Sequence, residues 1–247
     1  MRPILRPFVT LIAFLAVWYL VTRFSGIEAF LLPTPQSVAT ALWRTRILLG
    51  WSALTTLAEV LLGLLAGTAL GAACALAMVF SPVLQRWLMP VLLLSQAIPV
   101  FALAPLLVLW FGFGIASKVV MATLIIFFPV AAAFADGLRR TEPGWLDLAR
   151  SMGASPFAIL RFVRLPAALP AFASGLRVAT AIAPIGAVVG EWVGASGGLG
   201  YVMLSSNARI QTDETFAALT VLAAMAMLLW ALVDAGLRRL LYWIPAA

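Results

Sequence analysis

The chain has 247 residues, of which 64% are hydrophobic and 10% are charged. Soluble domains carry about 25% charged residues, and a water-soluble fold of this composition would have too little polar surface to cover its core. The composition therefore excludes a soluble enzyme. The sequence contains no histidine and one cysteine, Cys74, which excludes an internal disulfide, a His/Cys metal site and imidazole catalysis.

A transmembrane helix needs about 20 mostly apolar residues to cross about 30 Å of hydrocarbon. Six segments meet this requirement: residues 8–24, 54–80, 88–113, 117–138, 171–193 and 216–237. The first follows two arginines, but its apolar run is longer than that of a signal peptide and no small-x-small cleavage site precedes Arg23. We interpret it as an uncleaved span. The sequence thus predicts an all-α integral membrane protein with six transmembrane helices in a single domain, residues 1–247.

The cations of the loops predict the orientation, because cytoplasmic loops carry an excess of Arg and Lys. With the N-terminus inside, eleven of the 16 cations lie on the cytoplasmic side, and both termini are cytoplasmic. The inner cations are Arg2, Arg6, Arg86, Arg139, Arg140, Arg150, Arg161, Arg164, Arg177, Arg238 and Arg239. The outer cations are Arg23, Arg44, Arg46, Lys118 and Arg209.

Two further patterns predict structure rather than function. Pro33-Thr34-Pro35-Gln36 opens a short external helix that continues to about Leu49, with Leu42 and Trp43 able to lie on the membrane surface. In the second span, glycines recur every four residues, which predicts close packing against a neighbouring helix. These glycines are Gly63, Gly67 and Gly71.

The longest cytoplasmic stretch, residues 139–170, predicts two short helices joined by a glycine. Pro143 suits the first turn of a helix, and Gly153 can end that helix in the left-handed conformation. Ser155 is a suitable N-cap for a second helix that has Pro156 at its first position. We expect this second helix to stop before Leu165-Pro166, because the residue before a proline resists the α region.

The two predicted helices present apolar side chains with arginines at the rim. A single amphipathic surface helix would explain one such element, but two in tandem favour a docking surface for a partner protein. The apolar residues are Leu148, Met152, Phe157 and Leu160, and the arginines are Arg150, Arg161 and Arg164.

This stretch resembles the EAA loop of ABC-importer permeases, whose pattern is Glu-Ala-Ala, three residues, Gly, nine residues and Ile-x-Leu-Pro. Here Asp147-Leu148-Ala149 comes first, Gly153 lies six residues after Asp147, and Val163-Arg164-Leu165-Pro166 ends the pattern. The departures are Asp147 for Glu, Leu148 for Ala and Val163 for Ile. Residues 97–99, 102–106, 110–114, 190–195 and 198–201 are similar to the subgroup that serves nitrate, sulfonates, taurine and aminopyrimidine precursors.

The resemblance implies the fold of a type I ABC importer permease in a bacterial inner membrane. Two copies of the permease, or one copy with a paralogue, would form the pathway. Two ATP-binding subunits would dock on the loop, and a periplasmic or lipoprotein solute-binding protein would deliver the solute. The implied ATPase-coupling residues are Asp147, Leu148, Ala149, Gly153, Ala154, Ser155, Val163, Leu165 and Pro166.

The residues independently predict that ATP is hydrolysed elsewhere. A P-loop needs Gly-x-x-x-x-Gly-Lys-Ser/Thr, and the only lysine, Lys118, is preceded by Ser117 and followed by Val119. We therefore expect that the chain is not an enzyme and binds no cofactor, and that ATP and Mg²⁺ are bound by the partner ATPase.

Polar side chains in the spans are candidates for the substrate path, because a charge at the centre of a membrane helix costs about 2.5–3.5 kcal/mol. The proline that follows Gln96 should loosen the third span. Two aromatic residues near the fifth span offer flat surfaces, although aromatics at a span end also serve as interfacial anchors. The candidates are Glu59, Gln96, Pro99, Glu191, Trp192, Tyr201 and Asn207.

Each acidic candidate also has a structural interpretation. Glu59 could be interfacial and solvated, and Glu191 could pair with Arg209 or cap a helix. The glycine-rich run at residues 194–200 could cradle an anion only if a helix started directly after it. We favour a flexible re-entrant turn at this run.

The leading functional hypothesis is the membrane subunit of an ATP-driven importer. The solute would be a small organic molecule, aminopyrimidine- or thiamine-precursor-like, or sulfonate- or taurine-like. The alternative is a self-sufficient secondary transporter or channel, but such proteins commonly contain inverted repeats, and this sequence shows none. A membrane-embedded enzyme is disfavoured because the carboxylates do not cluster at motif spacing.

Overall fold

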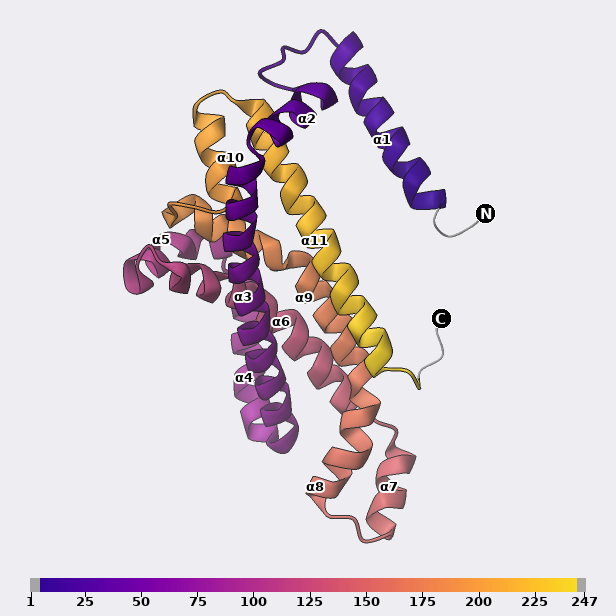
Figure 1. The fold of residues 1–247 in the computed structure, drawn as a ribbon. Helices are drawn as coiled ribbons and strands as arrows, with labels where there is room; N and C mark the ends of the chain where they lie inside the picture. Colours follow the sequence, from indigo (N-terminus) through magenta and orange to yellow (C-terminus); the bar gives the residue numbers. More distant parts are fainter. Residues whose placement is uncertain (1–4, 244–247) are drawn as a thin grey trace.

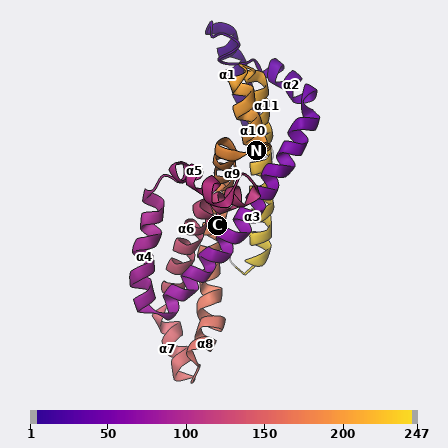
Figure 2. The same cartoon turned by 90° about the vertical axis from the view of Figure 1, so that its left-hand side faces the viewer.

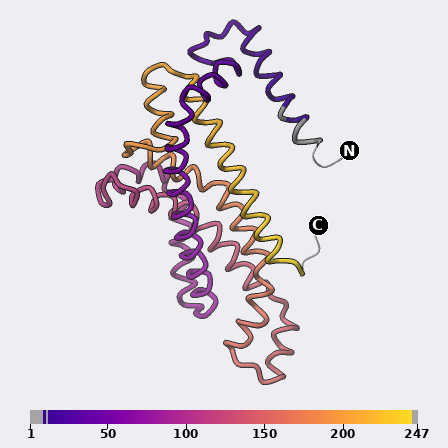
Figure 3. Tube along the Cα trace, in the orientation of Figure 1, coloured from indigo at the N-terminus to yellow at the C-terminus, as the bar shows by residue number. Residues whose placement is uncertain are grey.

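The computed structural model describes residues 5–243, and all regular elements within them are helical. Figure 1 shows an elongated bundle, and the tube in Figure 3 follows the same path from end to end. The helices are α1 (Leu5–Phe24), α2 (Pro35–Arg44), α3 (Arg46–Phe80), α4 (Pro82–Ala97), α5 (Val100–Phe111), α6 (Ile115–Arg139), α7 (Pro143–Ser151), α8 (Pro156–Ile159), the π-helical segment η1 (Leu160–Arg164), α9 (Leu165–Gly194), α10 (Leu199–Ala208) and α11 (Thr212–Leu240).

The centre of the bundle is α6, which packs along both α3 and α9, and α11 packs against α9. The hairpin of α7 and α8 projects beyond the bundle at the end opposite α2, in both Figure 1 and the view turned by 90° in Figure 2. Trp18 joins α1 to the rest, since its Nε1 donates to the Pro33 carbonyl at 3.1 Å and its ring stacks on Phe216. The α7–α8 hairpin therefore lies at one end of the bundle, and α2 lies at the other.

The predicted close packing of the second span is confirmed. The glycines of α3 face α6 so closely that a Cβ at Gly67 would lie 2.7 Å from Ile126 Cγ2, and one at Gly71 would lie 2.7 Å from the Phe127 carbonyl oxygen. On the other side of α6, a Cβ at Gly186 of α9 would lie 2.6 Å from Ala122 Cα. Small residues on both sides of α6 thus allow the three helices to approach closely.

Between residues 5 and 243, four helices are long and apolar enough to cross a membrane, or five if the bent pair α4 and α5 forms one span. The segment predicted as the third span, residues 88–113, is sharply bent, because α4 and α5 meet at 99°, and the predicted loosening at Pro99 is confirmed. Ile98 and Pro99 both have extended backbone conformations, as expected for a proline and the residue before it. In α1, the apolar stretch Ile12–Phe24 is shorter than a span, so six spans and the placement of the termini stay predictions.

The short helix predicted after Pro33 begins as predicted and ends earlier. Thr34 caps α2, since its Oγ1 accepts a hydrogen bond from the Ser37 N–H at 3.2 Å. The helix ends at Arg44 rather than near Leu49, and α3 starts at Arg46, before the predicted span. Arg44 pairs with Asp213 at 3.2 Å and Glu214 at 3.1 Å, which attaches this end of the chain to α11.

Candidate functional site

The predicted helix–glycine–helix arrangement within residues 139–170 is confirmed. Helix α7 starts at Pro143, and Gly153 follows it with φ of +77°, in the left-handed region. The Ala154 N–H donates to the Ala149 carbonyl at 3.0 Å, which closes the turn. Ser155 caps α8, because its Oγ accepts a hydrogen bond from the Ala158 N–H at 3.2 Å. Local cap chemistry therefore determines the shape of this hairpin.

The prediction that the second helix stops before Pro166 is wrong. Leu165 is α-helical, with φ of −61° and ψ of −52°, and the helix runs on from Pro156 to Gly194 over 39 residues. The π-helical turn η1 lies directly before the proline. A wider turn shifts the hydrogen-bond register at the point where the proline lacks an N–H and its ring would meet an earlier carbonyl. The second arm of the hairpin is thus continuous with α9, over about 58 Å at 1.5 Å per residue.

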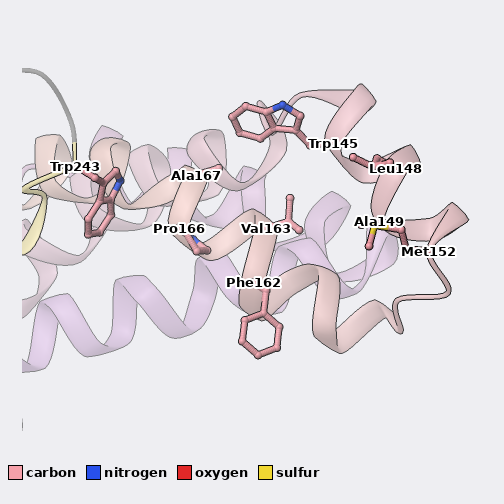
Figure 4. Close-up of a pocket in the computed structure, with 9 residues that line it drawn as sticks. All are labelled: Trp145, Leu148, Ala149, Met152, Phe162, Val163, Pro166, Ala167 and Trp243. Carbon is pink, nitrogen blue, oxygen red and sulfur yellow. The ribbon is translucent and has the colours of Figure 1, made fainter.

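A groove of about 490 Å³ lies between α7 and the start of α9, as Figure 4 shows. Its lining is almost entirely apolar and includes Trp243 from beyond α11. Leu148 and Met152 are exposed on the α7 side, and Phe162 is exposed on the η1 side. The lining residues are Trp145, Leu148, Ala149, Met152, Phe162, Val163, Pro166, Ala167 and Trp243.

Polar contacts surround this groove but do not fill it. Asp147, at the position of the EAA glutamate, pairs with Arg150 at 2.8 Å, and both side chains are exposed. The Arg161 guanidinium lies 5.7 Å from the centre of the Phe162 ring. Leu160, predicted as an exposed apolar contact, is buried instead and packs in the cluster that contains Met78 of α3. Phe157 is exposed as predicted.

The candidate path residues fall into an exposed and a buried group. The exposed group is uncharged and contains Gln96, Pro99, Trp192, Tyr201 and Asn207. Gln96 lies at the end of α4, where its Nε2 donates to Ser95 Oγ at 3.4 Å, and Pro99 forms the bend between α4 and α5. The two acids form the buried group, because Glu59 is 3% exposed and Glu191 is 1% exposed.

Glu191 caps a helix, one of the two structural alternatives for this residue. Its Oε1 accepts a hydrogen bond from the Thr56 hydroxyl at 2.6 Å, and its Oε2 accepts one from the Gly200 N–H at 2.5 Å. The Leu199 N–H donates to Thr56 Oγ1 at 2.8 Å. The first turn of α10 is therefore bound to a carboxylate. A negative charge is favourable there, because the N-terminal end of a helix is the positive end of its dipole. The proposed pairing with Arg209 is wrong.

Arg209 instead binds near its own end of α10. Its Nε donates to Gln211 Oε1 at 2.7 Å, and its Nη2 lies 3.8 Å from Glu214 Oε2.

The glycine-rich run is a carboxylate-binding loop rather than a free re-entrant turn. Helix α10 begins at Leu199, directly after the loop, and this helix start meets the condition for anion binding. Gly198 has φ of +104°, and a Cβ at Gly200 would lie 2.7 Å from Glu191 Oε2. The anion that these glycines accommodate is thus a side chain of the same protein.

Lys118 completes the site, although its position in the sequence indicated a solvated outer cation. It is 2% exposed, and its Nζ donates to the carbonyls of Phe113 at 2.5 Å, Gly114 at 3.0 Å and Gly194. We call Thr56, Glu59, Lys118 and Glu191, with the backbone groups that they bind, the buried polar cluster. The cluster joins α3, α6, α9 and the start of α10.

One sequence signal could have placed Glu59 in this cluster. The glycine stripe of α3 repeats every four residues from Gly71 to Gly63, and one further step back along the helix reaches Glu59. The same face therefore contacts α6 at Glu59. No comparable signal exists for Thr56, whose contact with Glu191 joins residues 135 positions apart.

Long apolar helices with a protruding hairpin define a multi-pass membrane protein with an apolar groove at one end. Residues 61–241 match the family described as the binding-protein-dependent transport system inner membrane component, and the chain belongs to this family. It is 50% identical over 239 residues to a probable ABC transporter permease protein of Haemophilus influenzae, covering 97% of this chain and 98% of the relative.

Two further proteins are similar to this chain, one in sequence and one in structure. The chain is 35% identical to the formylaminopyrimidine transport permease protein ThiX of Halalkalibacterium halodurans, covering 97% of this chain and 96% of that protein. The inward-facing MetNI methionine ABC transporter superposes with a TM-score of 0.69 at 22% identity, covering 79% of this chain and 97% of that chain. The second likeness concerns the fold alone. The chain is a permease component of the ABC importer class, whose ATP-hydrolysing subunit is a separate protein.

Proposed function

We propose that this permease translocates a small organic solute across a bacterial inner membrane, with the energy supplied by ATP hydrolysis on a docked subunit. The groove beside α7 supports this function, because it exposes apolar side chains on a hairpin that is continuous with α9. Exposed apolar surface rimmed by charged residues is typical of a protein interface. A movement imposed on the hairpin would be transmitted along α9 to the opposite end of the bundle.

The assembly that fits this role contains a second copy of the permease, two ATP-binding subunits and a solute-binding protein on the outer side. In this arrangement the hairpin and both termini are cytoplasmic, in agreement with the positive-inside distribution of the arginines. The ATPase subunits hold ATP and Mg²⁺. The permease supplies the docking surface and the path.

We assign the solute path to the exposed group Gln96, Pro99, Trp192, Tyr201 and Asn207. Glu59 and Glu191 are buried behind the residues that line this path. The exposed group offers amides and aromatic rings and no charge, which favours a planar, hydrogen-bonding solute over a strongly anionic one. An aminopyrimidine or a similar thiamine-precursor heterocycle has this chemistry. The likeness to the formylaminopyrimidine permease supports this choice, and a sulfonate such as taurine is the competing solute.

Docking is tested by placing a charge in the groove. In Leu148→Asp, an exposed groove residue becomes an anion, and we expect the ATPase to be lost on co-purification while the permease still inserts. The control Gln36→Asp adds the same charge on the exposed surface of α2, at the opposite end of the bundle, and should retain the ATPase. Equal retention in both variants would contradict the docking role.

The importer and its solute are tested by transport into proteoliposomes that contain permease and ATPase, with the solute-binding protein outside. Uptake should require ATP and should be observed with a hydroxymethyl- or formylaminopyrimidine. Uptake of taurine or an alkanesulfonate instead would overturn the solute class and leave the permease role intact. Uptake by the permease without ATPase would establish the alternative, a secondary transporter or channel.

A further inference from the structure

The buried polar cluster contains one more carboxyl group than ammonium groups. Its charged members are Glu59 from α3, Lys118 from α6 and Glu191 from α9. Of the other helices that pack against α3, α6 or α9, α5 (Val100–Phe111) and α10 (Leu199–Ala208) contain no Asp, Glu, Lys or Arg. The acids of α11 are paired with arginines, Asp213 and Glu214 with Arg44 and Asp234 with Arg177 and Arg238, and Arg86 of α4 is exposed. If all three groups were ionised, the cluster would hold an uncompensated negative charge away from water, which is strongly unfavourable.

Glu191 is surrounded by groups that stabilise an anion. The Thr56 hydroxyl and the Gly200 N–H donate to its two oxygens at 2.6 Å and 2.5 Å. The N-terminal end of α10 adds a favourable dipole. Lys118 lies close enough to attract it electrostatically. These groups together stabilise the ionised form of Glu191.

Glu59 has none of these partners. Its Oε2 is buried and receives no hydrogen bond from any described residue. Lys118 provides no donor, because its three N–H groups are directed at the carbonyls of Phe113, Gly114 and Gly194. The neighbour within hydrogen-bonding reach of the Glu59 carboxyl is the Glu191 carboxylate, which only accepts.

We propose that Glu59 is an internal proton-binding site: its carboxyl group is protonated in the folded permease and donates a hydrogen bond to the ionised Glu191. One proton between two adjacent carboxyl groups removes their repulsion and supplies the missing donor. The proton comes from a hydronium ion of the surrounding water: one O–H bond of that ion breaks, one O–H bond forms on Glu59, and a water molecule is left. The cluster then contains one anion and one cation, and Glu59 positions Glu191 for its contact with α10.

The proton is tested by infrared spectroscopy of the full chain in lipid nanodiscs at about pH 6.5, where exposed carboxyl groups are ionised. The wild type should show the carbonyl band of a protonated carboxyl group, and Glu59→Gln should remove it. Glu28→Gln is the matched control, because Glu28 is exposed in the loop before α2, and it should leave the band unchanged. This measurement needs no ATPase, so its outcome is independent of the proposed transport function.

Folding yield gives a second, separate readout. A glutamine amide keeps the shape of a protonated carboxyl group and still donates to Glu191, so Glu59→Gln should be purified within about twofold of the wild-type yield. Three results would each overturn the proposal: no band in the wild type, a band that persists in Glu59→Gln, or a large loss of yield in Glu59→Gln. The last would mean that the cluster needs a charge on Glu59.

Discussion

The two ends of α9 are built in opposite ways. Around Gly194, charged and hydroxyl side chains are buried, and Glu191 and Lys118 bind groups of the chain itself. Around Leu165, the large apolar residues Leu148, Met152 and Phe162 are exposed around a groove. A single continuous helix joins the two ends.

The polar groups at one end of α9 therefore bind other parts of the same chain, whereas the apolar residues at the other end remain exposed. At the polar end, Glu191 and Lys118 bind groups on four helices of the chain, so a change there should disturb folding and the relative positions of α3, α6 and α9. The apolar end leaves large side chains exposed, so under the proposed docking role a change there should disturb assembly and leave insertion intact. Each prediction below tests one side of this division.

The largest effect is expected for Glu191→Ala. This change removes the acceptor of the Gly200 N–H and the nearer of two acceptors of the Thr56 hydroxyl, which keeps the Ser52 carbonyl, and it leaves Lys118 without a neighbouring anion. Removing one partner from a buried charged network costs about 3–5 kcal/mol. We expect the yield of folded protein in detergent, measured by size-exclusion chromatography after a heating step, to fall more than tenfold.

Arg209 provides the control for this prediction. It makes no contact with Glu191 and instead binds Gln211 and Glu214. Adding Arg209→Gln to the Glu191 variant should therefore not restore the yield. Rescue by the second change would show that the two residues are coupled and would contradict the observed position of Glu191.

A smaller loss is expected for Gly198→Ala. Gly198 has φ of +104°, and its added Cβ would meet the Glu191 carboxylate. Backbone strain of this kind costs about 1–3 kcal/mol, and the displaced carboxylate would also weaken the bond to the Gly200 N–H. The apparent melting temperature of the purified permease should decrease.

The adjacent Gly197 is a matched control for the same substitution. A Cβ there would have no atom within 4 Å, and its φ is not in the left-handed region. Gly197→Ala should melt at the wild-type temperature. If both variants melt alike, the glycines of this loop do not serve the carboxylate.

The apolar end was largely predictable from the sequence because its signals are local. Pro143, Gly153 and Ser155 each act on the backbone within a few residues, and each occurs where the helix–glycine–helix pattern requires it. The continuity past Pro166 was not predictable in the same way. It depends on the π-helical turn before the proline, and no single residue type encodes such a shift of hydrogen-bond register.

The polar end was predicted only as separate residues. The sequence singled out Glu59 and Glu191, but their shared site depends on contacts between α3, α6, α9 and α10, over as many as 143 positions in the case of the Leu199–Thr56 bond. Lys118 was assigned to the outer surface because it lies near the start of a span. Its burial follows from carbonyls at both the start of α6 and the end of α9, which only the folded arrangement brings together.

The smallest effect on stability, confined to the apolar end, is expected for Gly153→Val. Gly153 has φ of +77° with no atom within 4 Å of an added Cβ, so the cost is a backbone cost of about 1–2 kcal/mol and not a clash. The turn should relax towards negative φ and change the direction of α7 relative to α8. Because the hairpin packs outside the bundle, membrane insertion and yield should be unchanged. Co-purification of the ATPase should decrease.

Gly144→Val separates this backbone effect from the addition of a valine to the hairpin. Gly144 lies in α7, its φ is not left-handed, and an added Cβ would have no atom within 4 Å. Valine at this position therefore causes no backbone strain, and its helix propensity is more favourable than that of glycine. ATPase retention measured by quantitative immunoblotting should be normal for this variant. If the two variants retain the ATPase equally, the direction of α7 does not determine docking. The groove itself would then account for binding without any requirement for the left-handed turn.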